Sequence, residues 1–154
     1  MSDIKFTVNK DDLTVTTTRT FNAPKQKVWD VVTDPEMLPK WWGPAQYTTI
    51  VDKMDFKVGG QWRFVQKDDK DEYGFHGEYL EISEPDKLSD TFEWEGMPGH
   101  VLTETMTLEE VDGKTHYTSV SKFSDLADLE GMVGMGMEDG NKEGVERLAK
   151  LVEA

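Results

Sequence analysis

The sequence changes its hydrophobic period near residue 125, and this change constrains the fold more than any other feature. Before it, seven short segments alternate apolar and polar side chains, which predicts β-strands. These segments span residues 13–21, 47–56, 61–67, 73–83, 87–95, 101–111 and 114–123. After it, apolar residues recur with helical spacing. The pattern predicts an α+β domain, in which an antiparallel sheet buries one face against a final helix.

Turn residues separate the predicted strands and favour hairpins. Asp112-Gly113 is a two-residue pair that favours a tight hairpin between the last two strands. Two short helices are expected between the first and second strands. Pro24 suits the first turn of one, which runs to Asp34, and Pro35 begins the other. We expect these helices to cover one end of the sheet.

The C-terminal segment predicts one helix of nearly 30 residues, which would span about 40 Å. Its apolar stripe comprises Leu126, Leu129, Met132, Val133, Val145, Leu148, Leu151 and Val152. Gly136, Gly140 and Gly144 recur every four residues along it, and each glycine costs up to about 1 kcal/mol in a helix interior. Three explanations remain open: close packing, a later helix start near Glu138, or space left for a cavity.

Length and charge limit the class of protein. With 154 residues, the chain is expected to form a single domain over residues 13–154, preceded by a polar extension over residues 1–12. The net charge of −14 disfavours nucleic acid and membrane surfaces as partners. Cysteine is absent, and neither a signal peptide nor a spanning segment is recognised. We therefore expect a cytoplasmic protein, either a monomer or a homodimer.

Bulky apolar residues fall at period-2 positions of the predicted strands, among them Trp62, Phe64, Phe92, Trp94 and Met106. Trp42, Phe123, Met132 and Met135 add to this set from flanking segments and the helix. The residues fit two interpretations, a filled core or an apolar cavity for a small hydrophobic molecule. Residue types alone do not separate them.

Few polar residues indicate chemistry. His76 is the one candidate for acid–base work inside a cavity, whereas His100 and His116 are expected to be exposed. Arg19 and Arg63 are expected to form structural ion pairs, with Glu78, Glu81 and Glu104 as candidate partners. Recognition of an acidic group on a ligand is the alternative. No metal site, cofactor site or activated nucleophile is predicted, so no catalytic residue is assigned.

Several short motifs, in order and spacing, resemble one family. They are Arg19–Pro24, Val28-Trp29, Thr33-Asp34-Pro35, Trp41–Pro44, Gly59-Gly60 with Trp62-Arg63, Gly77–Tyr79 with Glu81-Ile82, and Gly136–Gly140. The chain resembles the START-like helix-grip (SRPBCC) superfamily, and within it the heat-shock protein 90 ATPase-activator homologue-like group. The resemblance implies a curved antiparallel sheet of about six to seven strands around a long C-terminal helix, with a cavity between them. It also implies a link to the stress response.

With that cavity, the leading expectation is non-catalytic binding of a small hydrophobic ligand of the lipid, polyketide or flavonoid type. The expected ligand-binding residues are Trp42, Trp62, Phe64, Phe75, His76, Tyr79, Phe92, Trp94, Met106, Phe123, Met132, Met135, Gly136 and Gly140. Two alternatives remain: a cyclase or hydrolase that uses His76 in the cavity, and a chaperone-binding or protein-binding adaptor.

Overall fold

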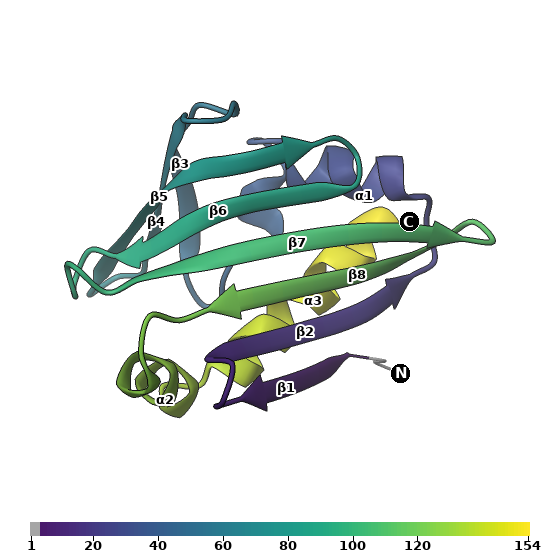
Figure 1. Cartoon of the computed structure of the whole chain (residues 1–154). Coiled ribbons are helices and arrows are strands. Elements are labelled where there is room, and N and C mark those ends of the chain that lie inside the picture. The colour runs from purple at the N-terminus through teal and green to yellow at the C-terminus, as the bar shows by residue number, and fades with distance from the viewer. Residues whose placement is uncertain (1–3) are drawn as a thin grey trace.

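The protein folds around one curved antiparallel sheet, seen in a computed structural model that describes residues 4–154. The eight strands lie in the order β1-β2-β8-β7-β6-β5-β4-β3 (Figure 1). Their bounds are β1 Lys5–Asn9, β2 Thr14–Phe21, β3 Thr48–Met54, β4 Gln61–Lys67, β5 Glu72–Ser83, β6 Lys87–Trp94, β7 Val101–Val111 and β8 Lys114–Lys122. The α+β class and the curved sheet expected from the sequence are confirmed.

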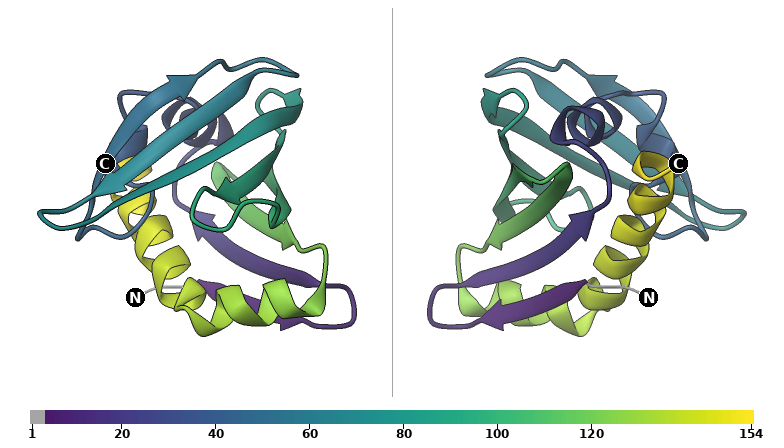
Figure 2. Two further views of the ribbon diagram at one scale, coloured as in Figure 1. Left: turned by 90° about the vertical axis from the view of Figure 1, so that its left-hand side faces the viewer. Right: turned by 90° about the vertical axis from the view of Figure 1, so that its right-hand side faces the viewer.

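The helices occupy one side of this sheet. α1 (Lys25–Val32) and the 3-10 helix η1 (Leu38–Lys40) follow β2, while α2 (Leu126–Gly134) and α3 (Met137–Val152) end the chain. Figure 2 shows α3 lying across the concave side of the sheet. The buried face of α3 contains Val145, Leu148, Ala149 and Val152, which share one core cluster with α1 and the adjoining strands. Burial of this stripe fixes the helix over the sheet.

The edge strand β1 was not predicted from the sequence. Lys5–Asn9 pairs with Thr14–Thr18 of β2, within the stretch that we expected to be a polar extension. Its alternate residues are exposed because it lies at the edge of the sheet. An edge strand needs only one apolar face and one partner, so its sequence signal is weak.

The prediction of a single long C-terminal helix was wrong, because the segment forms two helices, α2 and α3. Gly136 adopts a left-handed backbone conformation with φ of +93°, which ends α2 and precedes the first residue of α3. A glycine carries no Cβ, so it adopts this conformation at little steric cost. α3 begins at Met137, close to the later start near Glu138 that the sequence left open.

The three glycines of the predicted stripe, Gly136, Gly140 and Gly144, have three different structural roles. Gly136 provides the turn between α2 and α3. A Cβ at Gly144 would lie 3.2 Å from the backbone oxygen of Trp41, so glycine there permits close packing. A Cβ at Gly140 would meet nothing within 4 Å, because this residue borders a cavity. Each of the three explanations therefore applies to one glycine.

Arg19 ties β2 to α3, but not through the expected partners. Its guanidinium lies 3.1 Å from Glu146 of α3 and 3.8 Å from Glu153, the residue that follows α3. It also sits 5.5 Å from the centre of the Phe21 ring. The structural role was predicted correctly, whereas the proposed partners on neighbouring strands were wrong, since Glu81 instead pairs with Lys87.

Candidate ligand cavity

A cavity of about 790 Å³ lies between the concave face of the sheet and the helices. Twelve of the fourteen residues expected at a ligand site line it. They are Trp42, Phe64, Phe75, Tyr79, Phe92, Trp94, Met106, Phe123, Met132, Met135, Gly136 and Gly140. The volume is within the range of small-molecule pockets, and the lining is mainly apolar.

Aromatic rings form one wall of this cavity. Trp42 meets Phe64 and Phe75 edge to face, with ring centres 5.2 and 5.5 Å apart. Phe75 stacks on Phe92 of the next strand at 5.4 Å. These side chains come from period-2 positions on β4, β5 and β6, and Trp42 follows η1. Their mutual contacts hold the wall in place without filling the space in front of it.

Trp62 does not line the cavity. It is buried, and its ring packs against Phe64 with ring centres 4.6 Å apart and against Phe92 at 6.1 Å. The strand face was predicted correctly, since Phe64 of the same strand lines the cavity, but the Trp62 ring is covered and does not reach the cavity surface. Its role is to support the wall.

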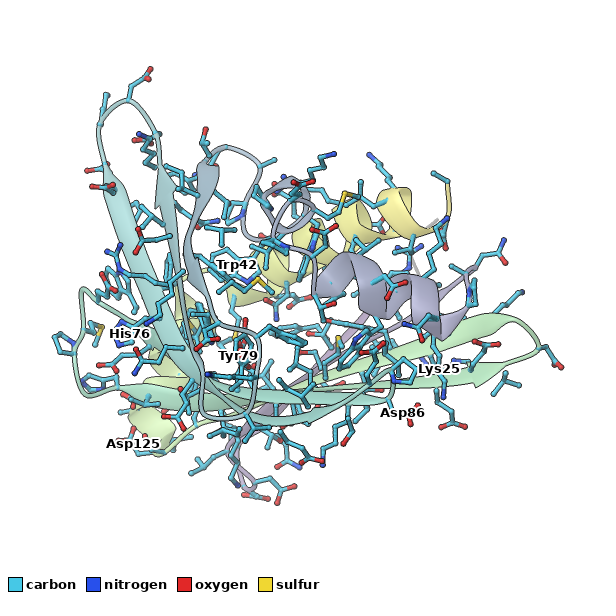
Figure 3. All side chains as sticks on the ribbon, turned by 90° about the horizontal axis from the view of Figure 1, so that it is seen from above. Lys25, Trp42, His76, Tyr79, Asp86 and Asp125 are labelled. Carbon is cyan, nitrogen blue, oxygen red and sulfur yellow. The ribbon has the colours of Figure 1, made fainter. Side chains whose placement is uncertain are left out.

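His76 also lies outside the cavity, so its expected place there was wrong. Figure 3 shows Trp42 and Tyr79 in the interior, with His76 on the other side of β5. The His76 Nδ1 and Nε2 atoms lie 2.9 Å from Glu95 and 3.2 Å from Glu93. Strand alternation explains this, because His76 is one residue out of phase with the inward-facing Phe75.

Arg63 completes this outer cluster. It donates two hydrogen bonds of 2.8 Å to Glu95 and lies 3.5 Å from Asp52. The bonds from Arg63, with a smaller contribution from His76, lower the pKa of Glu95 to about 2. Arg63 therefore has the structural role predicted for it, but with Glu95 and Asp52 as partners. The cluster lies on the outer face of the sheet, and neither Arg63 nor His76 lines the cavity.

Three carboxylates that sequence reasoning did not assign to the cavity line it: Asp90, Glu104, and Asp128, which pairs with His100. Asp90 of β6 and Glu104 of β7 are directly opposite in the strand register, and both face the cavity. Side chains so placed have Cβ atoms about 4.5–5.5 Å apart. A period-2 signal was present in the sequence, since Asp90 is in phase with Leu88, Phe92 and Trp94. Glu104 is likewise in phase with Leu102 and Met106.

Hydroxyl groups extend this polar row across the sheet. Tyr79 of β5 is opposite Asp90, and Ser121 of β8 is opposite Glu104. Tyr117 of β8 also lines the cavity. The floor thus offers two carboxyl groups and several hydroxyls within a mainly apolar space. We call Asp90 and Glu104 the carboxylate pair.

Burial alters the acidity of the polar floor. It raises the pKa of Glu104 to about 7, and it raises the pKa of Asp90 well above its ordinary value, with the charge of Glu104 adding to the effect. The Trp62 indole opposes part of the rise at Asp90. Burial also raises the pKa of Tyr117 to about 12. The pair therefore holds a proton near neutral pH, because two ionised carboxylates without a cationic partner are costly in an apolar space.

The cavity reaches the surface between the loop after β6 and α2. Met97, Val101 and Met135 line the cavity and are also exposed, and the exposed fraction of Met135 is 69%. Across this region His100 Nδ1 lies 2.7 Å from an Asp128 carboxylate oxygen, which links the loop to α2. His100 is exposed, as predicted.

A comparison with protein families shows the family to which the chain belongs. The model for activator of Hsp90 ATPase homolog 1-like proteins matches residues 22–153, most of the sequence. The chain belongs to this family. The resemblance inferred from the sequence motifs is thereby confirmed, and with it a fold suited to binding ligands in a cavity. No ligand follows from membership, because the shared motifs are mainly structural. The comparison with curated proteins gave no match.

Solved structures of similar proteins support the same fold. A protein from Mycobacterium smegmatis is 26% identical with a TM-score of 0.89, and 98% of each chain is covered. One from Arthrobacter aurescens is 25% identical with a TM-score of 0.90, covering 96% of this chain and 90% of the other. One from Staphylococcus epidermidis is 28% identical with a TM-score of 0.80, covering 95% and 93%.

Proposed function

We propose that this chain is a non-catalytic protein that binds a small hydrophobic molecule in the cavity between the sheet and α3. The observation that carries the proposal is a space of about 790 Å³ lined by twelve of the residues expected there. Binding gains about 25 cal/mol for each Å² of apolar surface removed from water. A lipid, a polyketide or a flavonoid would each offer such surface. Three methionine side chains of the lining suit ligands of variable shape, namely Met106, Met132 and Met135.

Catalysis by His76 loses its basis, because that ring lies on the outer face of β5. His100, which borders the opening, is bonded to Asp128 of α2 and has no paired nucleophile among the described lining residues. A binding role requires neither. We further propose a cytoplasmic location and a partner that is a small molecule rather than a nucleic acid, in line with the net charge of −14. None of the helices in residues 4–154 is long and apolar enough to cross a membrane.

Native mass spectrometry of the protein purified from cells tests the proposal. We expect one small molecule per chain, released by organic extraction and identified by its fragment masses. The stripped protein should then rebind the same molecule with that stoichiometry. A bare protein that also binds nothing from a panel of lipids, flavonoids and polyketides would contradict the proposal and favour a protein-binding adaptor.

A further inference from the structure

The carboxylate pair is half-buried and faces the cavity, and it has no cationic partner among residues 4–154. Across the described residues, no Lys, Arg or His forms an ion pair with Asp90 or Glu104. The one basic side chain among the described lining residues is His100, and it is held by Asp128. A carboxyl group in such a place either stays protonated or, when it ionises, needs a positively charged neighbour.

The groups around the pair could complete a site for a cation. An ammonium group has three hydrogen-bond donors, and Asp90, Glu104, Tyr117 and Ser121 present acceptors or hydroxyls to it. The Trp62 indole N–H also faces Asp90, but it carries no charge. The aromatic wall beside the floor would contact an apolar body attached to that group, and aromatic faces also attract cations. The residues of α3 that line the cavity are Met137, Gly140, Asn141, Gly144 and Val145, none of which titrates.

We propose that the ligand is a hydrophobic amine, whose protonated nitrogen binds between Asp90 and Glu104 and whose apolar part occupies the cavity. This inference rests on the proposed function and names the class of ligand within it. The ligand's charge replaces the proton that the pair holds when the cavity is empty. Amine binding near neutral pH is therefore coupled to proton release from the pair.

Titration calorimetry with decylamine, decanol and decanoic acid tests this inference, because the three probes share one chain and differ in the head group. We expect decylamine to bind at least about tenfold more tightly than decanol, since a charge-assisted contact exceeds a neutral one. Decanoate should bind most weakly. In buffers of different ionisation enthalpy, the amine should show proton release at pH 7, and decanol should show none.

Matched variants locate the effect. Asp90→Asn with Glu104→Gln should abolish the preference for decylamine while leaving decanol binding intact. Glu109→Gln makes the same change as Glu104→Gln on the same strand, but at an exposed residue that does not line the cavity, and should keep the preference. Circular dichroism of each variant establishes that it is folded.

The outcomes separate this inference from the proposed function. Equal affinity for decanol and decylamine would overturn the amine inference and leave cavity binding standing. A preference for the amine that persists in the double variant would also overturn it, because attraction by the acidic surface would then explain the result. If no probe binds the stripped protein, cavity binding itself fails and the amine inference fails with it.

Discussion

Asp90 and Glu104 are opposite each other on β6 and β7, and both carboxyl groups face the cavity. Most of the surrounding lining is apolar, so the pair is the main electrostatic feature of the interior. Its effect on stability can be measured without knowing the ligand. The empty protein should be sensitive to pH in a way that depends on these two residues.

Glu104→Gln should stabilise the ligand-free protein at alkaline pH. Burial raises the folded-state pKa of Glu104 to about 7, above the unfolded value near 4.5. Between these values the folded state holds more protons than the unfolded state, so the free energy of unfolding falls as pH rises. Glutamine cannot ionise, and at pH 8 the variant should be more stable by up to roughly 3 kcal/mol. Urea unfolding at pH 5 and pH 8 measures the difference.

The control for that experiment is Glu109→Gln, which changes an exposed carboxylate on the same strand. Its free energy of unfolding should follow the wild-type protein at both pH values. If Glu104→Gln also follows the wild type, the carboxyl group is hydrated in the folded state and the pair is not confined as described.

Gly140→Ala and Gly144→Ala should change the free energy of unfolding by different amounts or in opposite directions. Both replace a glycine within α3, where alanine is favoured by about 0.5–1 kcal/mol. A Cβ at position 140 meets open space, so the full gain is expected in the free energy of unfolding. At position 144 it lies 3.2 Å from the Trp41 oxygen, which offsets the gain. Equal stabilisation in chemical denaturation would show that α3 is not closely packed at Gly144.

Gly136→Ala should destabilise the protein by about 1–2 kcal/mol, because an L-residue is strained in the left-handed region. A Cβ there meets no neighbouring atom, so the cost is one of backbone conformation alone. Gly131→Ala is the matched control, since it lies inside α2 and is also free of contacts. Thermal unfolding should show a lower Tm for the first variant and an unchanged or higher Tm for the second.

His76→Ala should leave ligand uptake unchanged. The ring contacts Glu93 and Glu95 on the outer side of β5, and the loss of these exposed pairs should cost less than about 1 kcal/mol in stability. Calorimetry with decanol compares the variant with the wild type. A folded variant that no longer binds would mean that His76 acts on the cavity after all.

The strands were predictable because their side chains alternate and turn residues separate them. Residues 61–67 and 101–111 form β4 and β7 with the predicted bounds, and Asp112-Gly113 makes the expected hairpin with positive φ at both residues. The break at Gly136 was not predictable in the same way. A glycine permits a left-handed turn, but only the packing of α2 and α3 decides that it adopts one.

The apolar lining was also predictable, since alternation gives the face of each strand. Trp62 marks the limit of this prediction. Alternation gives the face on which its ring lies, but not that other side chains cover the ring. His76 was assigned to the cavity from its chemistry, although its neighbour Phe75 occupies the inward position. Asp90 was missed for the opposite reason: a carboxylate is expected to face water, and its phase with Phe92 was given too little weight. Functional polar groups often break the pattern in this manner.

Gly140→Leu tests the central claim, that a ligand occupies the cavity, most directly. The new side chain enters open space at the cavity border and replaces a glycine within a helix, so the variant should remain folded. We would measure decanol binding to the stripped wild type and to this variant by calorimetry. The account predicts one site in the wild type and at least about tenfold weaker binding in the variant. Unchanged binding by a folded variant would contradict it.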